Sequence, residues 1–199
     1  IEHEAKDTFP EPTPQSKPVD WLMAVRHSQR KGDLRKCRQL LKDGVDAIAA
    51  LPDSDEFQKS VFLPQFVERL VALGEFEEAR KACLKISPDS LSGAVFTSSG
   101  VVTVPKKALR HYSLLTVAHA QAKAGLTEDA TSTARSIGDR SARSAAHWII
   151  AMSLADQQKL ESALKHVAFA EDCYSDNAKL VEFGVHGPVE VRLHVYRTL

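Results

Sequence analysis

The sequence predicts an all-α fold, a right-handed α-solenoid of about four antiparallel helix pairs. From Val19 onward, Ala, Leu, Glu, Lys, Arg and Gln dominate and apolar residues recur at helical spacing. A Gly followed by an acidic turn and a small residue recurs as GDLRKC, GEFEEA and GLTEDA, and QKLESA repeats it with Gln158 in place of Gly. The distance from Gly125 to Gln158 is 33 residues, the period of a helix–turn–helix unit. The earlier intervals of 42 and 51 residues are longer, which predicts insertions.

Residues 1–18 are predicted to form an extended Pro-rich tether with almost no burial, ahead of a helical domain over 19–199. Prolines at positions 10, 12, 14 and 18 disfavour helix there. The chain begins at Ile1 without an initiator Met, so we expect a processed product or part of a longer protein. The sequence does not determine the cellular compartment of the protein. The cytoplasm is slightly favoured, and export or membrane tethering is the alternative.

Four units are predicted, over about 19–50, 53–86, 105–137 and 139–173, followed by a C-terminal cap over 178–199. In each unit a Gly in the left-handed conformation ends the first helix. An acid or hydroxyl then starts the second helix, and Asp33 and Thr127 fit that N-cap role. The small residue six positions into each motif is expected where the two helices press together: Cys37, Ala79, Ala130 and Ala163.

Three segments depart from this plan. Pro64 falls inside the first helix of the second unit and is expected to kink or split it. In the insertion over 87–104, AVFT and VVTV flank SSG, which predicts either a small β-hairpin or an irregular loop. The alternation of Val189 to Tyr196 is typical of a strand, yet we favour a helix because a solenoid end needs a cap.

The Gly-acidic turn, the period and the small helix-B residues resemble tetratricopeptide repeats, over about Val19 to Cys173. The resemblance implies a groove lined by the first helix of each unit, which binds an extended peptide or a partner helix. It assigns to that groove Leu22, Arg26, Gln29, Glu68, Val71, Tyr112, Leu115, His119, Trp148 and Met152. The family's clamp for acidic C-terminal tails needs an Asn, and the chain's single Asn, Asn177, lies outside the units, so that function is rejected.

Trp148 and Arg143 form the sharpest candidate anchor for a partner. An aromatic ring beside a cation is a common hot spot, but Trp148 could equally pack in the core. Arg110 and Arg143 recur at matching positions 33 residues apart. They predict either a ladder of cations that grips carboxylates or local ion pairs, for example with Asp139.

Composition excludes several classes of function. Lys+Arg and Asp+Glu both total 26, which argues against nucleic-acid binding, and no apolar run is long enough to span a membrane. The basic segment 26–42 could contact phosphate or an acidic protein, but a solvated face balanced elsewhere is favoured. The eight histidines and three cysteines show no HxxxH or CxxC spacing, so no metal site is expected.

The predicted function is therefore a protein-interaction module or scaffold, not an enzyme, with no cofactor. No Walker, GxGxxG, GxSxG or kinase motif is present. The expected partner is another protein or a peptide, not a nucleic acid. The predicted contact residues are Arg26, Tyr112, Leu115, His119, Arg143, Trp148 and Met152. The alternative is a non-catalytic accessory or regulatory domain of a larger enzyme or of a membrane-anchored complex.

Overall fold

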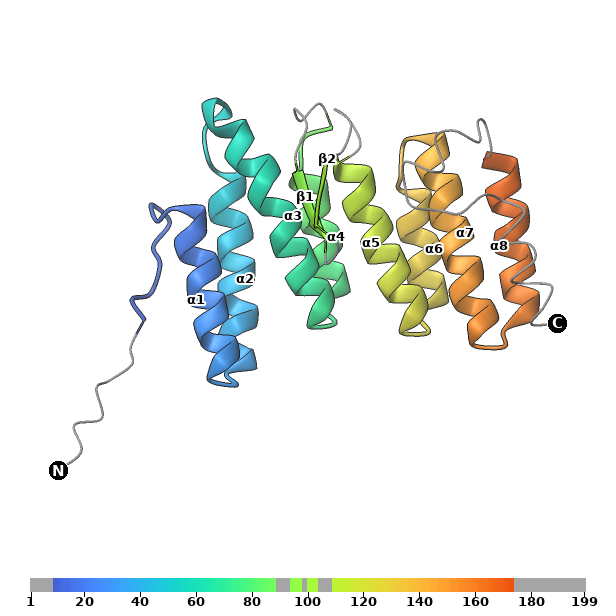
Figure 1. Ribbon diagram of the computed structural model, residues 1–199, viewed down its shortest axis with the longest axis horizontal. Coiled ribbons are helices and arrows are strands. Elements are labelled where there is room, and N and C mark those ends of the chain that lie inside the picture. Colours follow the sequence, from blue (N-terminus) through green and yellow to red (C-terminus); the bar gives the residue numbers. More distant parts are fainter. Residues whose placement is uncertain (1–8, 89–93, 98–99, 104–108, 174–199) are drawn as a thin grey trace.

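The computed structural model describes residues 9–88, 94–97, 100–103 and 109–173, and this part of the chain is mostly helical (Figure 1). The all-α class is therefore confirmed for the described residues. A short 3-10 helix, Asp53–Asp55, precedes the third α-helix. The α-helices are α1 (Pro18–Arg30), α2 (Leu34–Ala49), α3 (Glu56–Ala72), α4 (Phe76–Lys85), α5 (Leu109–Lys123), α6 (Thr127–Arg135), α7 (Arg140–Asp156) and α8 (Leu160–Cys173).

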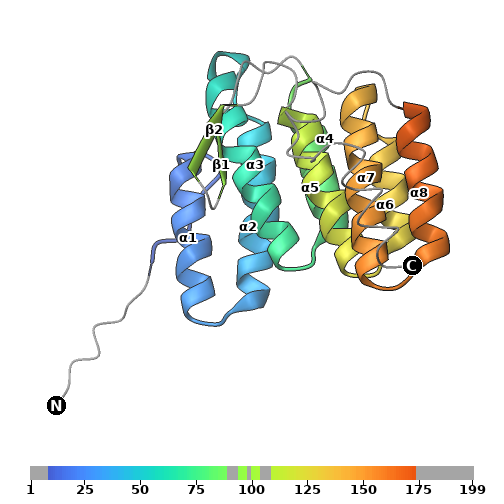
Figure 2. The same ribbon diagram turned by 45° about the vertical axis from the view of Figure 1, so that its right-hand side comes forward.

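The helices pack as consecutive pairs, α1 with α2, α3 with α4, α5 with α6 and α7 with α8, and the pairs stand in a row (Figures 1 and 2). Helix α3 also contacts α1 and α5, and α5 contacts α7. The odd-numbered helices thus share one side of the molecule and the even-numbered helices the other. We call these sides the odd face and the even face.

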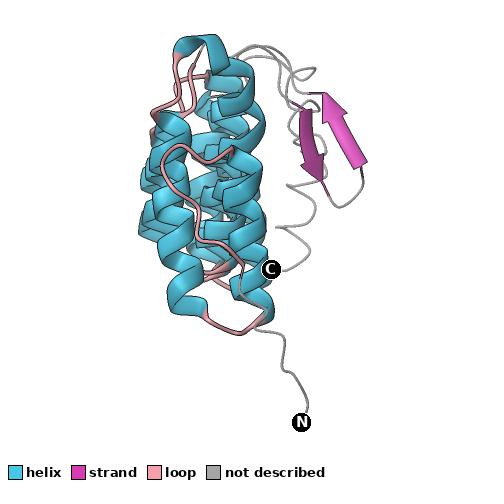
Figure 3. Cartoon of the chain, turned by 90° about the vertical axis from the view of Figure 1, so that its left-hand side faces the viewer, coloured by secondary structure: helices cyan, strands magenta, loops and turns pink. Residues whose placement is uncertain are grey.

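Two short strands, β1 (Ala94–Thr97) and β2 (Gly100–Thr103), lie within the insertion over 87–104. They pair antiparallel, with Ala94 opposite Thr103 and Thr97 opposite Gly100. Strand β1 lies against α3, and the strands stand on the odd face (Figure 3). The predicted cap over 178–199 lies outside the described residues, as do the first eight residues of the predicted tether.

A left-handed residue ends the first helix of every pair, as predicted. Gly32, Gly74 and Gly125 have φ angles of 73°, 75° and 81°. Gln158 takes the same conformation, with a φ of 60°, and it is the one non-Gly residue with positive φ in the described part of the chain. The turn therefore keeps its geometry even where the repeat has lost its glycine.

One local prediction fails: Thr127 is not an N-cap, because Leu126 holds that position and Thr127 is the first residue of α6. Of the two outcomes expected at Pro64, a split does not occur: α3 runs through Pro64, which is buried. By contrast, the Asp33 carboxylate accepts a hydrogen bond from the Lys36 amide at 2.9 Å and caps α2 as expected.

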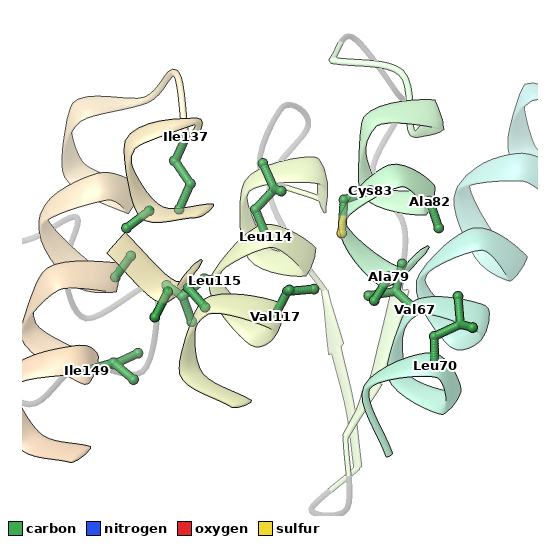
Figure 4. Close-up of a cluster of buried hydrophobic side chains, with 14 of the residues drawn as sticks. Val67, Leu70, Ala79, Ala82, Cys83, Leu114, Leu115, Val117, Ile137 and Ile149 are labelled. Carbon is green, nitrogen blue, oxygen red and sulfur yellow. The ribbon is translucent and has the colours of Figure 1, made fainter. Parts of the chain in front are cut away.

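The hydrophobic core runs continuously between the helix pairs. The small residues Cys37, Ala79, Ala130 and Ala163 are fully buried, as predicted, because each lets two helices approach closely. Figure 4 shows one stretch of the core, in which side chains of α3, α4 and α5 meet: Val67, Leu70, Ala79, Ala82, Cys83, Leu114 and Val117. Helix α7 is buried along nearly its whole length, so it packs on more than one side.

The N-terminal segment contributes to this packing. The Phe9 ring lies 5.8 Å from the His27 ring, centroid to centroid, and packs against the core. Glu11 forms an ion pair with Lys36 of α2. Residues 10, 11, 13–15 and 17 are exposed, as expected of a tether, whereas Phe9 packs against the core. No helix in the described ranges is long and apolar enough to cross a membrane.

Candidate partner-binding face

The odd face carries two arginines from neighbouring helices. Helix α1 buries Leu22 and Val25 and leaves Arg26 exposed on its outer side. Helix α3 holds Arg69 one turn before its C-terminal end, half-buried. The Arg69 Nη1 atom donates to the Gln29 Oε1 atom at a long 3.4 Å, so α1 and α3 meet at these side chains.

Arg69 is poorly satisfied for a charged group. Its buried Nε atom has no hydrogen-bond partner. Burial lowers the Arg69 pKa and the like charge of Arg26 lowers it further, while smaller effects of Cys37 and of the neighbouring Glu68 carboxylate act in the opposite direction. In the described part of the chain no carboxylate lies within ion-pair distance of Arg26 or Arg69. This spot therefore favours the approach of an anion.

Three cations of α2 and α4 are paired with acids on the even face. Arg38 of α2 contacts the Glu75 carboxylate at 2.7 Å, and Lys42 contacts Glu78 of α4 at 3.9 Å. Lys85 of α4 forms a third ion pair, with Asp46 of α2. The basic segment 26–42 is thus balanced by acids where it faces α4. Arg26, at its start, is not.

Helix α5 brings Tyr112 and His119 to the odd face, both half-buried. Burial raises the Tyr112 pKa, and the nearby Glu68 carboxylate raises it further, which places Tyr112 close to α3. Burial, with a smaller effect of Lys123, lowers the His119 pKa. Leu115, between them in sequence, is only 6% exposed and belongs to the core. Leu115 is therefore a core residue and not the partner contact that was predicted.

Trp148 does not reach the surface. Its side chain is 0% exposed and lies in the core, so the prediction of a partner anchor at Trp148 is corrected to a packing role. The reason is that α7 is enclosed on nearly all sides. Met152, one turn later, is partly buried and packs against the same core.

Arg143 binds the protein's own backbone. Its Nε atom donates to the Ile137 carbonyl at 2.9 Å and its Nη2 atom to the Gly138 carbonyl at 3.3 Å. Arg110, the matching residue of α5, donates to the Leu84 carbonyl at the end of α4. Both arginines thus bind carbonyls at or just beyond the end of the preceding even helix, where the helix dipole favours a cation. Arg143 forms no ion pair with Asp139, and the two arginines that were predicted to grip carboxylates instead donate to backbone carbonyls.

Two features escaped the sequence reasoning. The groove positions that the resemblance assigns in this unit are Glu68 and Val71, and Arg69, which lies between them in sequence, is not among them. His147 and His166 form a buried pair between α7 and α8, with their Nδ1 atoms 3.0 Å apart. Their separation along the chain gives no signal. Within the described residues, no group of three His, Cys, Asp or Glu side chains could hold a metal ion.

Comparison with known proteins finds no family model, no curated protein and no solved structure that matches this chain.

Proposed function

We propose that the chain is a protein-interaction module that binds an extended peptide or a helix of a partner protein on its odd face. The row of helix pairs would form a right-handed solenoid of the tetratricopeptide-like kind, and α1, α3 and α5 would line its groove. The observation that carries the proposal is the pair Arg26 and Arg69, two cations on adjacent odd helices that form no ion pair with a described residue, with the Arg69 Nε atom buried and unpartnered.

The partner would supply an acidic side chain to these two arginines. A carboxylate would give the Arg69 guanidinium a bidentate acceptor and would offset its repulsion from Arg26. A hydrogen bond to a charged group contributes about 1.5–3 kcal/mol, enough for a hot spot. Tyr112, half-buried and close to Glu68 of α3, would supply an apolar contact that excludes water from the ion pair.

Selection of random peptides displayed on phage against the purified chain tests this. The enriched peptides should share an acidic residue, and its replacement by the neutral amide should weaken binding about tenfold or more, measured by fluorescence anisotropy. The variant Arg26→Met with Arg69→Met should lose binding to the same degree. Arg80→Met, which breaks the ion pair with Glu77 away from the odd face, is the matched control and should bind as wild type.

Enriched peptides without an acidic residue would contradict the proposed partner chemistry. Unchanged binding to the double arginine variant would place the site elsewhere on the molecule.

A further inference from the structure

A pair of buried histidines joins the last two described helices. His147 of α7 and His166 of α8 are 2% and 4% exposed, and their Nδ1 atoms are 3.0 Å apart. Phe169 of α8 packs on both, with ring centroids 5.4 Å from His147 and 5.9 Å from His166. The proposed odd-face function uses neither histidine.

The hydrogen bonds around the pair fix the position of each proton. The Thr131 hydroxyl of α6 donates its one proton to the Thr127 carbonyl at 2.7 Å. The His166 Nε2 atom, 3.2 Å from the Thr131 oxygen, must therefore be the donor of that contact. A neutral His166 then has a bare Nδ1, which accepts the Nδ1–H of His147. The result is a directed chain of hydrogen bonds from α7 through α8 to α6.

The charges that face the pair are cations. Arg135 of α6 lies 5.6 Å from the Phe169 centroid, and Arg143 approaches from α7. Burial lowers the His147 pKa to about 4, helped by His166, Arg135 and Arg143. Burial, with Arg135, lowers the His166 pKa to about 4 as well. From α8, Asp172 contributes a backbone carbonyl, which accepts from Arg140 at 2.8 Å.

This arrangement is unsuited to a metal ion. A bound cation would stand beside two arginines, and one of the two facing nitrogens carries a proton. The chain of donors also ends at a backbone carbonyl and reaches no nucleophile, so it has no evident catalytic use. The His147–His166 pair is therefore a structural contact between α7 and α8, and it depends on both imidazoles being neutral.

We propose that His147 and His166 form an acid-sensitive latch that holds α8 on α6 and α7. Protonation of the His166 Nδ1 atom turns the acceptor into a donor that faces the His147 Nδ1–H. Two donors then oppose each other in a buried site lined by arginines, and α8 separates from the rest of the row.

The direction with pH follows from linkage. A free histidine has a pKa of about 6.5, so an opened site takes up protons below that pH while the closed site does not until about pH 4. The latch is at full strength above about pH 6.5 and weakens as the pH falls toward 4. At pH 5 each histidine favours the open form by about 30-fold, and both together by roughly a thousandfold.

Native-state hydrogen exchange of the α8 amides at pH 7 and pH 5, corrected for intrinsic rates, tests the latch. We expect the opening constant of α8 to rise at least about 30-fold at pH 5, and that of α1 to change far less. The variant His147→Phe with His166→Phe keeps aromatic packing around Phe169 and leaves Thr131 bonded to Thr127. Its α8 opening should change less than about threefold between the two pH values.

A second measurement needs no variant. The imidazole carbon-bound proton shifts of His147 and His166 in the folded protein should stay flat from pH 7.5 to about 5.5. The proposal is overturned if either ring titrates near 6.5 in the folded state, if α8 opening does not depend on pH, or if α1 and α8 open together.

Discussion

Gly44 of α2 faces the ring of Phe66 on α3 with no room for a side chain. A Cβ atom built on Gly44 would lie 2.5 Å from the Phe66 Cε1 atom and 3.0 Å from its Cζ atom. Phe66 is fully buried, so its ring has nowhere to move. The glycine is therefore a packing requirement between the first and second helix pairs.

We expect Gly44→Ala to destabilise the protein by about 1–3 kcal/mol through overpacking. Helix propensity alone would predict a gain of about 1 kcal/mol, so the sign of the effect separates the two causes. Urea unfolding followed by circular dichroism measures it. Adding Phe66→Leu to Gly44→Ala should recover part of the lost stability. If Gly44→Ala alone were more stable than wild type, the Phe66 ring would have to move aside to make room for the new methyl group.

Gln158→Gly should stabilise the protein by about 1 kcal/mol, because it removes a side chain from a left-handed residue. Gly125→Ala at the matching turn should cost about the same amount. A Cβ on Gly125 meets nothing closer than 3.6 Å, so only the backbone conformation opposes it. Thermal unfolding of the two variants measures both changes in stability. If both variants were stabilised, or both destabilised, the two turns would not be equivalent.

Arg143→Met should lower stability by about 0.5–1.5 kcal/mol, because carbonyls beyond the end of α6 lose their donor. Arg110→Met should do the same at the end of α4. Arg26→Met, which removes an exposed cation with no such contact, should change stability by less than about 0.5 kcal/mol. Chemical denaturation of the three variants separates a capping arginine from a surface arginine.

Phe9→Ala should destabilise α1 by about 1–2 kcal/mol through the loss of apolar contact with His27 and the core. Pro10→Ala, at an exposed neighbouring position, should leave stability unchanged and serves as the control. The free energy of unfolding in urea measures both. A Phe9→Ala variant as stable as wild type would restore the picture of a free tether.

The helices and their turns could be predicted because they depend on local chemistry. A left-handed glycine marks the turn of the first three pairs, and a small residue at a fixed distance after the turn marks all four. The partner-facing residues could not be predicted in the same way. The sequence of an apolar helix such as α7 does not show whether one of its sides is exposed to solvent or covered by other helices. Trp148 could therefore be predicted as a surface anchor although it is buried.

The contacts of the arginines could not be predicted either. Sequence shows acids near Arg143 but not backbone carbonyls, and the structure gives it two carbonyls. Pro64 was expected to kink or split its helix, and α3 runs through it unbroken. Pro64 costs α3 a hydrogen bond, but its ring is buried among the core side chains, and packing can compensate for the lost bond. Which cations stay without a carboxylate depends on contacts between residues far apart in the sequence.

The principal contacts of each helix are with helices no more than two places away along the chain. Such a pattern keeps the sequence separation between contacting residues short. Chains with short-range contacts of this kind close small loops first and fold fast, within about microseconds to milliseconds for helical proteins. Folding could then begin in any one helix pair and spread outward in both directions.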